Sequence, residues 1–469
     1  MDEETLAFTP ATELAALIRE KQVSPVEVMK STLARIERLE PRINAFAHLA
    51  ADAAMEGAKK AEADLMKGSP IGRIHGVPVT IKDLAWVADM PAQMGSNIFK
   101  GNMPPMDTPF VSRLKNQGGI VIGKTTTSEF GWTGVSHSPL TGITHNPWKH
   151  GMNAGASSAG AGAAAAAGLG HLHQGSDGAG SVRMPSHFCG VFGLKPTFGR
   201  IPYAPVGGGD NTSHIGPMAR TVADAALMME IMSGPSPLDH TTLETWPGDY
   251  TGRLMEGIKG KRIAYSPDLD LARVDPDVAE LVKRAVARFT ELGAHVEQVK
   301  TPWSAEGPEL IRTTWPAHLS RLIPRLAEWE SRMDPGLVAC IKDGAKVTMT
   351  DYQLARERKY AYVARQLAWL EDWDFLLTPA VSVAAFPAER LMPHHWPEHA
   401  WDWVSWAEFS YPFNFSGAPA ASVPCGFTPQ GLPVGLQIVG KRFDDLGVLQ
   451  ASAAFETIAP WADKRPALG

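Results

Sequence analysis

A serine that follows three small residues is the feature of this sequence most able to do chemistry. Ser181 comes directly after Gly178, Ala179 and Gly180, and Arg183 stands two residues further on. Small residues allow several backbone N–H groups to crowd around one point. Such a stretch forms either a tight turn or an oxyanion hole beside a nucleophile. This stretch alone leaves both interpretations open.

A second cluster of small residues lies upstream, at residues 154–160, which read AGASSAG and include Ser157. It continues into an alanine-rich run at 161–167, a good helix former with almost no side-chain bulk, so another segment can pack close to its backbone. Lys82 ends the mostly apolar run 78–81. Such a lysine is either a solvated edge residue or a buried amine. Burial would lower its pKa and make a neutral base available.

The elements that must position these residues alternate between strand and helix patterns. Ser24, followed by Pro25 and Glu27, has the pattern of a helix start. Further helices are expected at 108–117 and from Asp275 to about Leu292. Strand-like runs cover residues 75–84, 118–125, 261–268, 294–299, 374–383 and 431–440. Strands alternating with helices predict an α/β fold with a mixed sheet. No repeat or low-complexity linker divides the chain, so we expect one domain over 1–469.

The composition excludes several other classes of protein. Of the 469 residues, 44 % are hydrophobic and 20 % charged, which is ordinary for a soluble globular protein. The formal net charge of −6 argues against nucleic acid or an anionic membrane as a partner. The acidic N-terminus lacks an apolar signal-peptide core, and residues 160–170 are too short to span a bilayer. We therefore expect a cytoplasmic protein.

Two patterns that suggest other chemistry are not supported by their context. Residues 118–125, GGIVIGKT, match a phosphate-binding loop, but the Ile-Val-Ile interior favours a strand over a flexible loop. The three cysteines are isolated, and the histidines lack the spacing of metal ligands. The residues concerned are Cys189, Cys340, Cys425, His171, His173, His394, His395 and His399. We expect no metal, no cofactor and no disulfide framework.

Several long motifs, in order along the chain, resemble the amidase signature family. Residues 151–197, GMNAGASSAGAGAAAAAGLGHLHQGSDGAGSVRMPSHFCGVFGLKPT, look like its signature block. GVPVTIKD (76–83), GKTTTSEF (123–130), THNPW (144–148) and the segments within 416–440 match as well. The resemblance covers nearly the whole chain, and only about 300–415 reads as variable. It implies a large mixed central β-sheet flanked by helices on both faces.

The resemblance also implies a role for each motif residue. Ser181 would be the nucleophile, Lys82 the base, and Ser157 a bridging serine held with a cis peptide bond. The oxyanion hole would be formed by the backbone N–H groups of Gly178, Ala179, Gly180 and Ser181. The sequence departs from the usual family pattern, because GASSAGA replaces GGSSGGS and GAGS replaces TGGS. Ala179 could narrow the oxyanion hole or reshape the acyl pocket, so we expect an effect on specificity.

The expected substrate follows from the segment that passes beside the substrate in this family. Here that segment contains Gly131, Trp132 and Thr133. Trp132 is either a pocket wall or core. The tryptophan-rich stretch 386–414 is either a folded-over lid lining an apolar pocket or an irregular surface excursion packed on its own aromatic rings. We expect an amidohydrolase acting on apolar or aryl amides, with carbamates as an extension.

Two other functions remain open. One is the amidase subunit of a tRNA-dependent glutamine amidotransferase, although Met184 stands where those subunits typically have glutamine. The other is a catalytically silent binding protein on the same fold. A homodimer is possible, and the expected partner is a small-molecule amide or carbamate.

Overall fold

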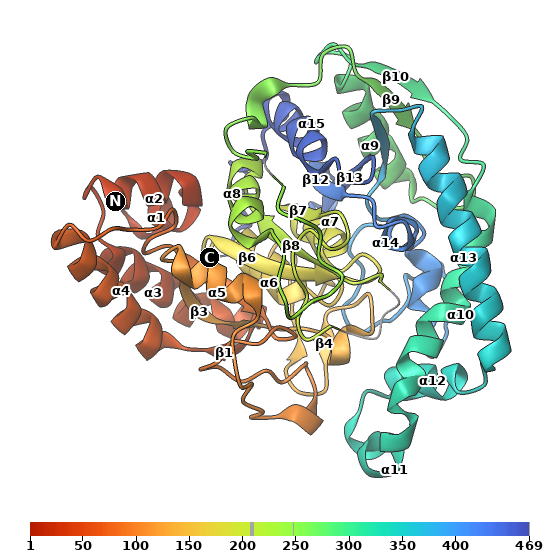
Figure 1. Cartoon of the computed structure of the whole chain (residues 1–469), viewed down its shortest axis with the longest axis horizontal. Coiled ribbons are helices and arrows are strands. Elements are labelled where there is room, and N and C mark those ends of the chain that lie inside the picture. The colour runs from red at the N-terminus through yellow and green to blue at the C-terminus, as the bar shows by residue number, and fades with distance from the viewer. Residues whose placement is uncertain (207–210, 247, 469) are drawn as a thin grey trace.

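A mixed β-sheet runs through the centre of the molecule (Figure 1). The computed structural model describes residues 1–206, 211–246 and 248–468. Within these residues the sheet has eleven strands in the order β1-β3-β2-β6-β8-β7-β12-β13-β11-β9-β10. Their bounds are β1 (Phe46–Leu49), β2 (Pro78–Lys82), β3 (Ile120–Thr125), β6 (Leu172–Asp177), β7 (Phe192–Lys195), β8 (His214–Ala219), β9 (Arg262–Tyr265), β10 (His295–Gln298), β11 (Phe375–Pro379), β12 (Ala420–Phe427) and β13 (Pro433–Gly440). A separate hairpin pairs β4 (His137–Ser138) with β5 (Gly142–Ile143).

The direction of the strands explains why the motif residues meet. β2 runs parallel to both of its neighbours, β3 and β6. Parallel strands end at the same edge of a sheet. Lys82, the last residue of β2, therefore lies near the end of β6, where Asp177 leads into the loop that carries Ser181.

Helices cover both faces of this sheet. α6 packs against β2, β3 and β6, and α7 against β7, β12 and β13, whereas α8, α9 and α15 cover the other face. The side chains of β3 show the division, because Val121 packs in one core cluster and its neighbour Ile122 in another. Successive residues of a strand point to opposite faces. The α/β fold with a mixed sheet and helices on both faces is confirmed.

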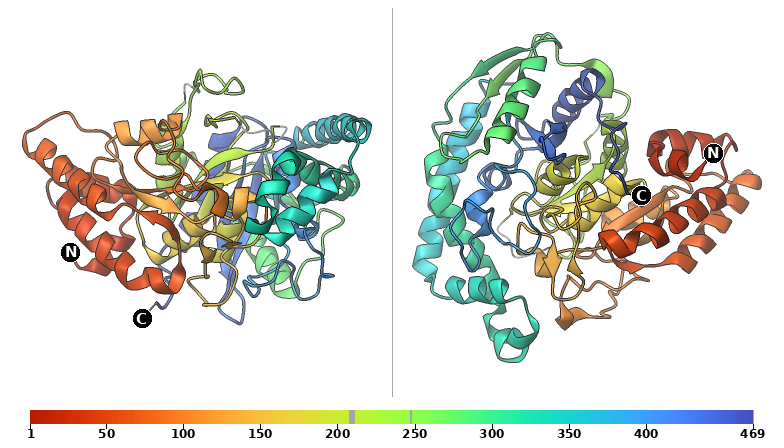
Figure 2. Two further views of the ribbon diagram at one scale, coloured as in Figure 1. Left: turned by 90° about the horizontal axis from the view of Figure 1, so that it is seen from below. Right: turned by 180° about the vertical axis from the view of Figure 1, so that it is seen from behind.

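The helices have the following bounds. They are α1 (Glu3–Phe8), α2 (Ala11–Arg19), α3 (Pro25–Ile43), α4 (Ala51–Met66), α5 (Pro109–Asn116), α6 (Ala159–Ala167), α7 (Arg183–Cys189), α8 (Val222–Met232), α9 (Pro276–Arg288), α10 (Gly307–Leu319), α11 (Leu326–Trp329), α12 (Pro335–Gly344), α13 (Met349–Leu370), α14 (Tyr411–Phe415) and α15 (Asp445–Ile458). The N-terminal helices α1–α4 and the helices α10–α13 lie at opposite ends of the molecule, as all three views show (Figures 1 and 2).

The predicted elements are confirmed, with shorter bounds. The run 118–125 is strand β3 and not a phosphate-binding loop, and the expected helix at 275–292 ends earlier, at Arg288. Ser24 caps α3, since its Oγ accepts hydrogen bonds from the N–H groups of Val26 at 3.0 Å and Glu27 at 3.4 Å. Throughout the described ranges, every helix is too short or too polar to cross a membrane.

Candidate active site

Lys82 is fully buried at the end of β2. Its Nζ lies 2.7 Å from Ser157 Oγ and 2.9 Å from both Ser158 Oγ and Ser176 Oγ. The backbone N–H of Lys82 donates to the side chain of Gln174 on β6 at 3.1 Å, which fixes the strand end. The alternative of a solvated edge lysine is therefore wrong.

The amine of Lys82 has no carboxylate within ion-pair distance among the described residues. Burial lowers the pKa of Lys82 well below its usual value, and the charge of Asp177 opposes this only in part. Desolvation penalises the charged form, so burial favours the neutral amine. A neutral amine has a lone pair that can accept a proton from one neighbouring hydroxyl.

Ser157 lies just before α6, where the small residues permit close packing. A Cβ on Gly160 would lie 2.5 Å from the backbone oxygen of Ala45, and one on Gly155 would lie 2.3 Å from Pro185 Cα. Gly155 also has φ +118°, which side-chain-bearing residues rarely adopt. The alanine-rich run is the helix α6 that the sequence predicts, and it seats Ser157 between neighbouring segments.

Ser157 and Ser181 are in direct contact. The N–H of Ser157 donates to Ser181 Oγ at 3.3 Å, and the exposed fractions of the two residues are 2 % and 4 %. The expected cis peptide bond at Ser157 is wrong, because the described residues contain a single cis bond, Ala204–Pro205. With a trans bond Ser157 still contacts both Lys82 and Ser181.

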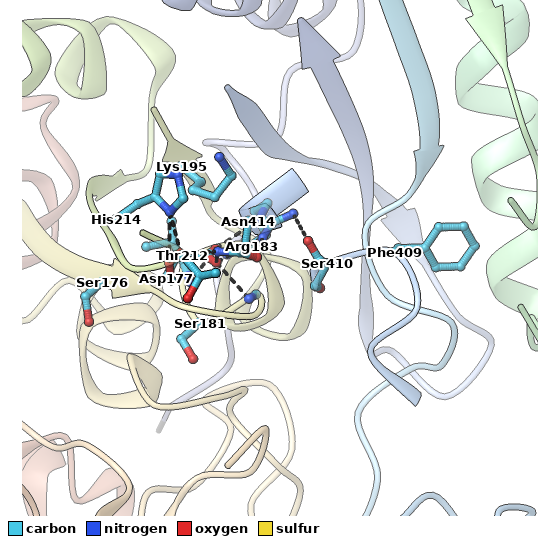
Figure 3. A network of polar contacts seen from close by, with 12 residues as sticks. Ser176, Asp177, Ser181, Arg183, Lys195, Thr212, His214, Phe409, Ser410 and Asn414 are labelled. Carbon is cyan, nitrogen blue, oxygen red and sulfur yellow. Dashed lines mark hydrogen bonds and ion pairs between the residues drawn. The ribbon is translucent and has the colours of Figure 1, made fainter. Parts of the chain in front are cut away.

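Asp177 and Arg183 form a buried ion pair beneath the loop that carries Ser181 (Figure 3). Arg183 Nη2 lies 2.9 Å from Asp177 Oδ1, and its Nε donates to Asp177 Oδ2 at 3.0 Å. Arg183 also donates to Asn414 Oδ1 at 2.6 Å and to the backbone oxygen of Ser410 at 3.0 Å. Burial would raise the pKa of Asp177, but the charge of Arg183 and its hydrogen bonds outweigh burial and keep the carboxylate ionised.

This carboxylate decides which backbone N–H groups can serve as an oxyanion hole. The N–H of Gly180 donates to Asp177 Oδ1 at 2.7 Å, so Gly180 is not an available donor. The N–H groups of Gly178, Ala179 and Ser181 have no acceptor within the part of the chain that the structure describes. The prediction is wrong for Gly180, because its N–H donates a hydrogen bond to the side chain of Asp177, three residues earlier. Gly180 instead allows the backbone to adopt φ +114°, a conformation that residues with a side chain rarely adopt.

A cavity opens beside these serines. It is lined by Leu84, Phe130, Gly131, Trp132, Ser157, Ser176, Gly178, Tyr203, Thr212, Ser213, Trp315, His318, Leu319 and Arg321. Its volume is about 130 Å³, close to the roughly 150 Å³ in which a benzene ring can bind. Most of the large side chains on its wall are apolar or aromatic, so it suits an apolar or aryl group.

Two of the three predicted substrate-side residues line this cavity. Gly131 is so close to the serines that a Cβ there would lie 3.4 Å from Ser157 Oγ. Trp132 forms part of the wall and is almost fully buried. Thr133 is fully buried and does not line the cavity.

The tryptophan-rich stretch packs behind this wall and does not cover it. Trp403 Nε1 donates to the backbone oxygen of Trp132 at 2.7 Å, and its ring meets Trp315 edge to face at 5.3 Å. Trp396, Trp401, Trp403 and Trp406 are all buried in one core cluster, and none of them lines the cavity. Of the two interpretations of 386–414, packing on aromatic rings is confirmed, but the four tryptophans are core residues and the segment is not a surface excursion.

Sequence reasoning missed several residues of the site. The sequence shows Asp177 only as part of a polar stretch and does not indicate its ionic and hydrogen-bond partners. One of them, Asn414, lies 237 residues away in sequence, so no local pattern connects the two residues. Tyr203, Trp315 and Arg321 come from segments that gave no motif. As for metals, the described residues contain no group of three or more histidine, cysteine or acidic side chains placed to hold an ion.

Comparisons with known proteins show the family of this chain. The family described as Amidase matches residues 27–449, so the chain belongs to it, and the resemblance to the amidase signature family is confirmed. The acylamidase of Rhodococcus erythropolis is 38 % identical and aligns over 100 % of this chain and 99 % of its own. A glutamyl-tRNA(Gln) amidotransferase subunit of Gloeobacter violaceus is 31 % identical, over 98 % of this chain and 99 % of its own.

Solved structures give the same result. 6-Aminohexanoate cyclic dimer hydrolase superposes with a TM-score of 0.90 at 28 % identity, covering 98 % of this chain and 99 % of that one. A bacterial aryl acylamidase of the amidase signature family gives a TM-score of 0.89 at 29 % identity, covering 97 % of each chain. The protein is a hydrolase of this family that acts on carbon–nitrogen bonds.

Proposed function

We propose that this protein cleaves the C–N bond of apolar or aryl amides through an acyl-enzyme on Ser181. One observation carries the proposal: the buried Lys82 contacts Ser157, and Ser157 both lines the aromatic cavity and contacts Ser181. A serine hydroxyl is a weak nucleophile until a base accepts its proton. The amine supplies that base without a histidine.

The proton moves in two steps. Lys82 Nζ accepts a proton from Ser157 Oγ, 2.7 Å away, while Ser157 Oγ accepts the proton of Ser181. This transfer requires the Ser181 hydroxyl to point toward Ser157 Oγ; in the structure Ser181 Oγ accepts from the Ser157 N–H at 3.3 Å. Ser181 Oγ then attacks the substrate carbonyl carbon, and the same relay returns the proton to the departing amine. Water hydrolyses the acyl-enzyme.

The negative oxygen that forms during the attack needs preorganised donors. The N–H groups of Gly178, Ala179 and Ser181, which have no acceptor among the described residues, are candidates. Removing one such donor typically costs about 3 kcal/mol of transition-state stabilisation. The ion pair of Asp177 with Arg183 fixes the loop that presents them. Ala179 places a methyl group beside these donors, and we infer that it affects which acyl groups fit.

The substrate class rests on the cavity wall. Phe130, Trp132 and Trp315 offer aromatic surface to a ring in the substrate. An acylamidase and an aryl acylamidase among the similar proteins support this class. Aryl carbamates are an extension: attack at their carbonyl expels the amine and leaves a carbonate ester on Ser181, which water converts to the alcohol and carbon dioxide.

The amidotransferase subunit is the second candidate, because subunits of that kind are 31 % identical to this chain. It predicts ammonia release from glutamine in the presence of partner subunits, and little turnover of anilides by the isolated chain. Met184 stands at the position where glutamine is typical of those subunits.

Amine release from four substrates tests the proposal. The panel holds an anilide, an aryl carbamate, a primary amide and glutamine, each incubated with wild type, Ser181→Ala and Ser186→Ala. Ser186 is the matched control, since it is a buried serine of α7 whose Oγ donates to the Val182 backbone oxygen at 2.8 Å, away from the cavity. We expect the anilide and carbamate to be cleaved, and only Ser181→Ala to be inactive. Preference for the primary amide, or glutamine turnover alone, would contradict the proposal.

A further inference from the structure

We propose that Arg321 binds a carboxylate on the substrate, so that the preferred substrates are aryl or apolar amides carrying an acidic group remote from the scissile bond. This inference rests on the proposed function and extends it to the charge of the substrate. Arg321 belongs to the 3₁₀ helix η5 (Ser320–Arg325), which follows α10, and lines the cavity that also exposes Ser157.

Among the described residues, the guanidinium of Arg321 has no acidic partner. Its Nη1 donates to the backbone oxygen of His318 at 2.9 Å. No carboxylate of residues 1–206, 211–246 or 248–468 lies within ion-pair distance of it. By contrast, Arg312 on the preceding helix lies 2.9 Å from Asp402. Arg321 is solvent-exposed, and because no described carboxylate pairs with it, it can pair with a carboxylate that enters the cavity.

The remainder of the wall matches an anion better than a cation. Among the described residues that line the cavity there is no aspartate or glutamate. Tyr203 lies on the same wall as Arg321. Burial raises the pKa of its phenol, and the positive charge of Arg321 opposes that rise. The indole N–H groups of Trp132 and Trp315 are buried and find no acceptor in the described structure. The wall thus has a surplus of donors and positive charge.

A matched substrate pair separates this inference from the proposed function. The pair is 4-acetamidobenzoate and the neutral 4-methylacetanilide, compared by kcat/KM for amine release. A partly solvated ion pair is worth about a two- to fivefold preference. We expect wild type to prefer the carboxylate by this factor, through a lower KM, and to lose the preference in concentrated salt, which screens exposed charges.

Two variants locate the preference. Arg321→Gln should abolish the preference. The neutral anilide is measured with the same variant, so that a general loss of turnover is distinguished from a loss confined to the carboxylate substrate. Arg325→Gln is the control, because Arg325 lies on the same short helix with its guanidinium 5.5 Å from the Trp329 ring centre and does not line the cavity. An equal or greater preference in Arg321→Gln, or a wild type that favours the neutral anilide, overturns the inference and leaves the proposed function intact.

Binding without turnover provides the second measurement. 4-Acetamidobenzoate is titrated into Ser181→Ala and followed by the fluorescence of the cavity tryptophans. We expect the Kd to rise about two- to fivefold when Arg321→Gln is added to this variant. An unchanged Kd contradicts the inference, whereas absence of amine release by wild type contradicts the proposed function.

Discussion

Replacing Lys82 by methionine separates catalysis from stability. Methionine keeps an unbranched apolar stem in the buried site but provides no base. General base catalysis typically contributes a factor of about 10² to 10⁴, or about 3–5 kcal/mol of barrier. Because Lys82 is the base nearest to Ser157, at 2.7 Å, we expect kcat for an anilide to fall by at least the lower factor.

The stability of this variant should change little. Lys82 is buried without an ionic partner in the described structure. Its neighbour Ser158 retains other bonds, since its Oγ donates to the Ser176 backbone oxygen at 3.1 Å and accepts from the Ser176 N–H at 3.2 Å. The lost hydrogen bonds, worth about 1 kcal/mol each, are offset because the amine no longer has to be desolvated. We therefore expect an unfolding free energy within about 2 kcal/mol of wild type.

Lys124→Met is the contrasting control. Lys124 is also fully buried, on the neighbouring strand β3, but its Nζ lies 3.3 Å from Asp83 Oδ1. Removing one partner of a buried ion pair leaves an uncompensated charge and costs about 3–5 kcal/mol. Thermal unfolding and single-turnover kinetics of both variants give the test: Lys124→Met loses stability and Lys82→Met loses activity. A Lys82→Met enzyme with more than about a tenth of wild-type kcat refutes the role given to Lys82.

Three further predictions concern the residues around this site. Gly131→Ala should lower kcat/KM for anilides about tenfold, because Gly131 has φ +71° and its new Cβ would lie 3.0 Å from Leu84 Cδ1 and 3.4 Å from Ser157 Oγ. Unchanged kinetics would mean that this wall does not touch the substrate. Lys82 must be neutral to act as a base, so kcat/KM should fall as the pH is lowered through the depressed pKa of Lys82. A pH–rate profile that stays flat on acidification would contradict this, provided that thermal unfolding shows the protein to be folded at each pH. Burial raises the pKa of Glu129 from 4.5 to about 7, so the folded protein holds a proton that the unfolded chain has lost. Stability should therefore decline as pH rises between these values, and Glu129→Gln should flatten that slope in thermal unfolding curves; an unaltered slope would assign it to other groups.

The sequence predicts the framework of the site because local patterns determine it. The Ser24 cap, the apolar strand ending in Lys82 and the alanine-rich run after Ser157 each depend on neighbouring residues. Parallel pairing of β2 with β6 then brings the motifs together. The resemblance added the order of the motifs along the chain.

The parts that could not be predicted depend on contacts between distant segments. Asn414, the partner of Asp177, comes from α14, which is distant in sequence. The N–H of Gly180 donates to the Asp177 carboxylate, and the residue types in this stretch do not reveal that hydrogen bond. Composition also does not show whether a tryptophan faces a cavity or the core, as Trp132 and Trp403 illustrate. The cis bond at Ser157 was carried over from the family and is trans in this structure.

Trapping the acyl-enzyme tests the central claim most directly. Rapid acid quenching of the enzyme with an activated aryl ester or carbamate, followed by peptide mass spectrometry, locates the acyl group. The account predicts that the added mass lies on Ser181 in wild type and is absent from Ser181→Ala. Acylation of another residue, or undiminished amine release by Ser181→Ala, would contradict it.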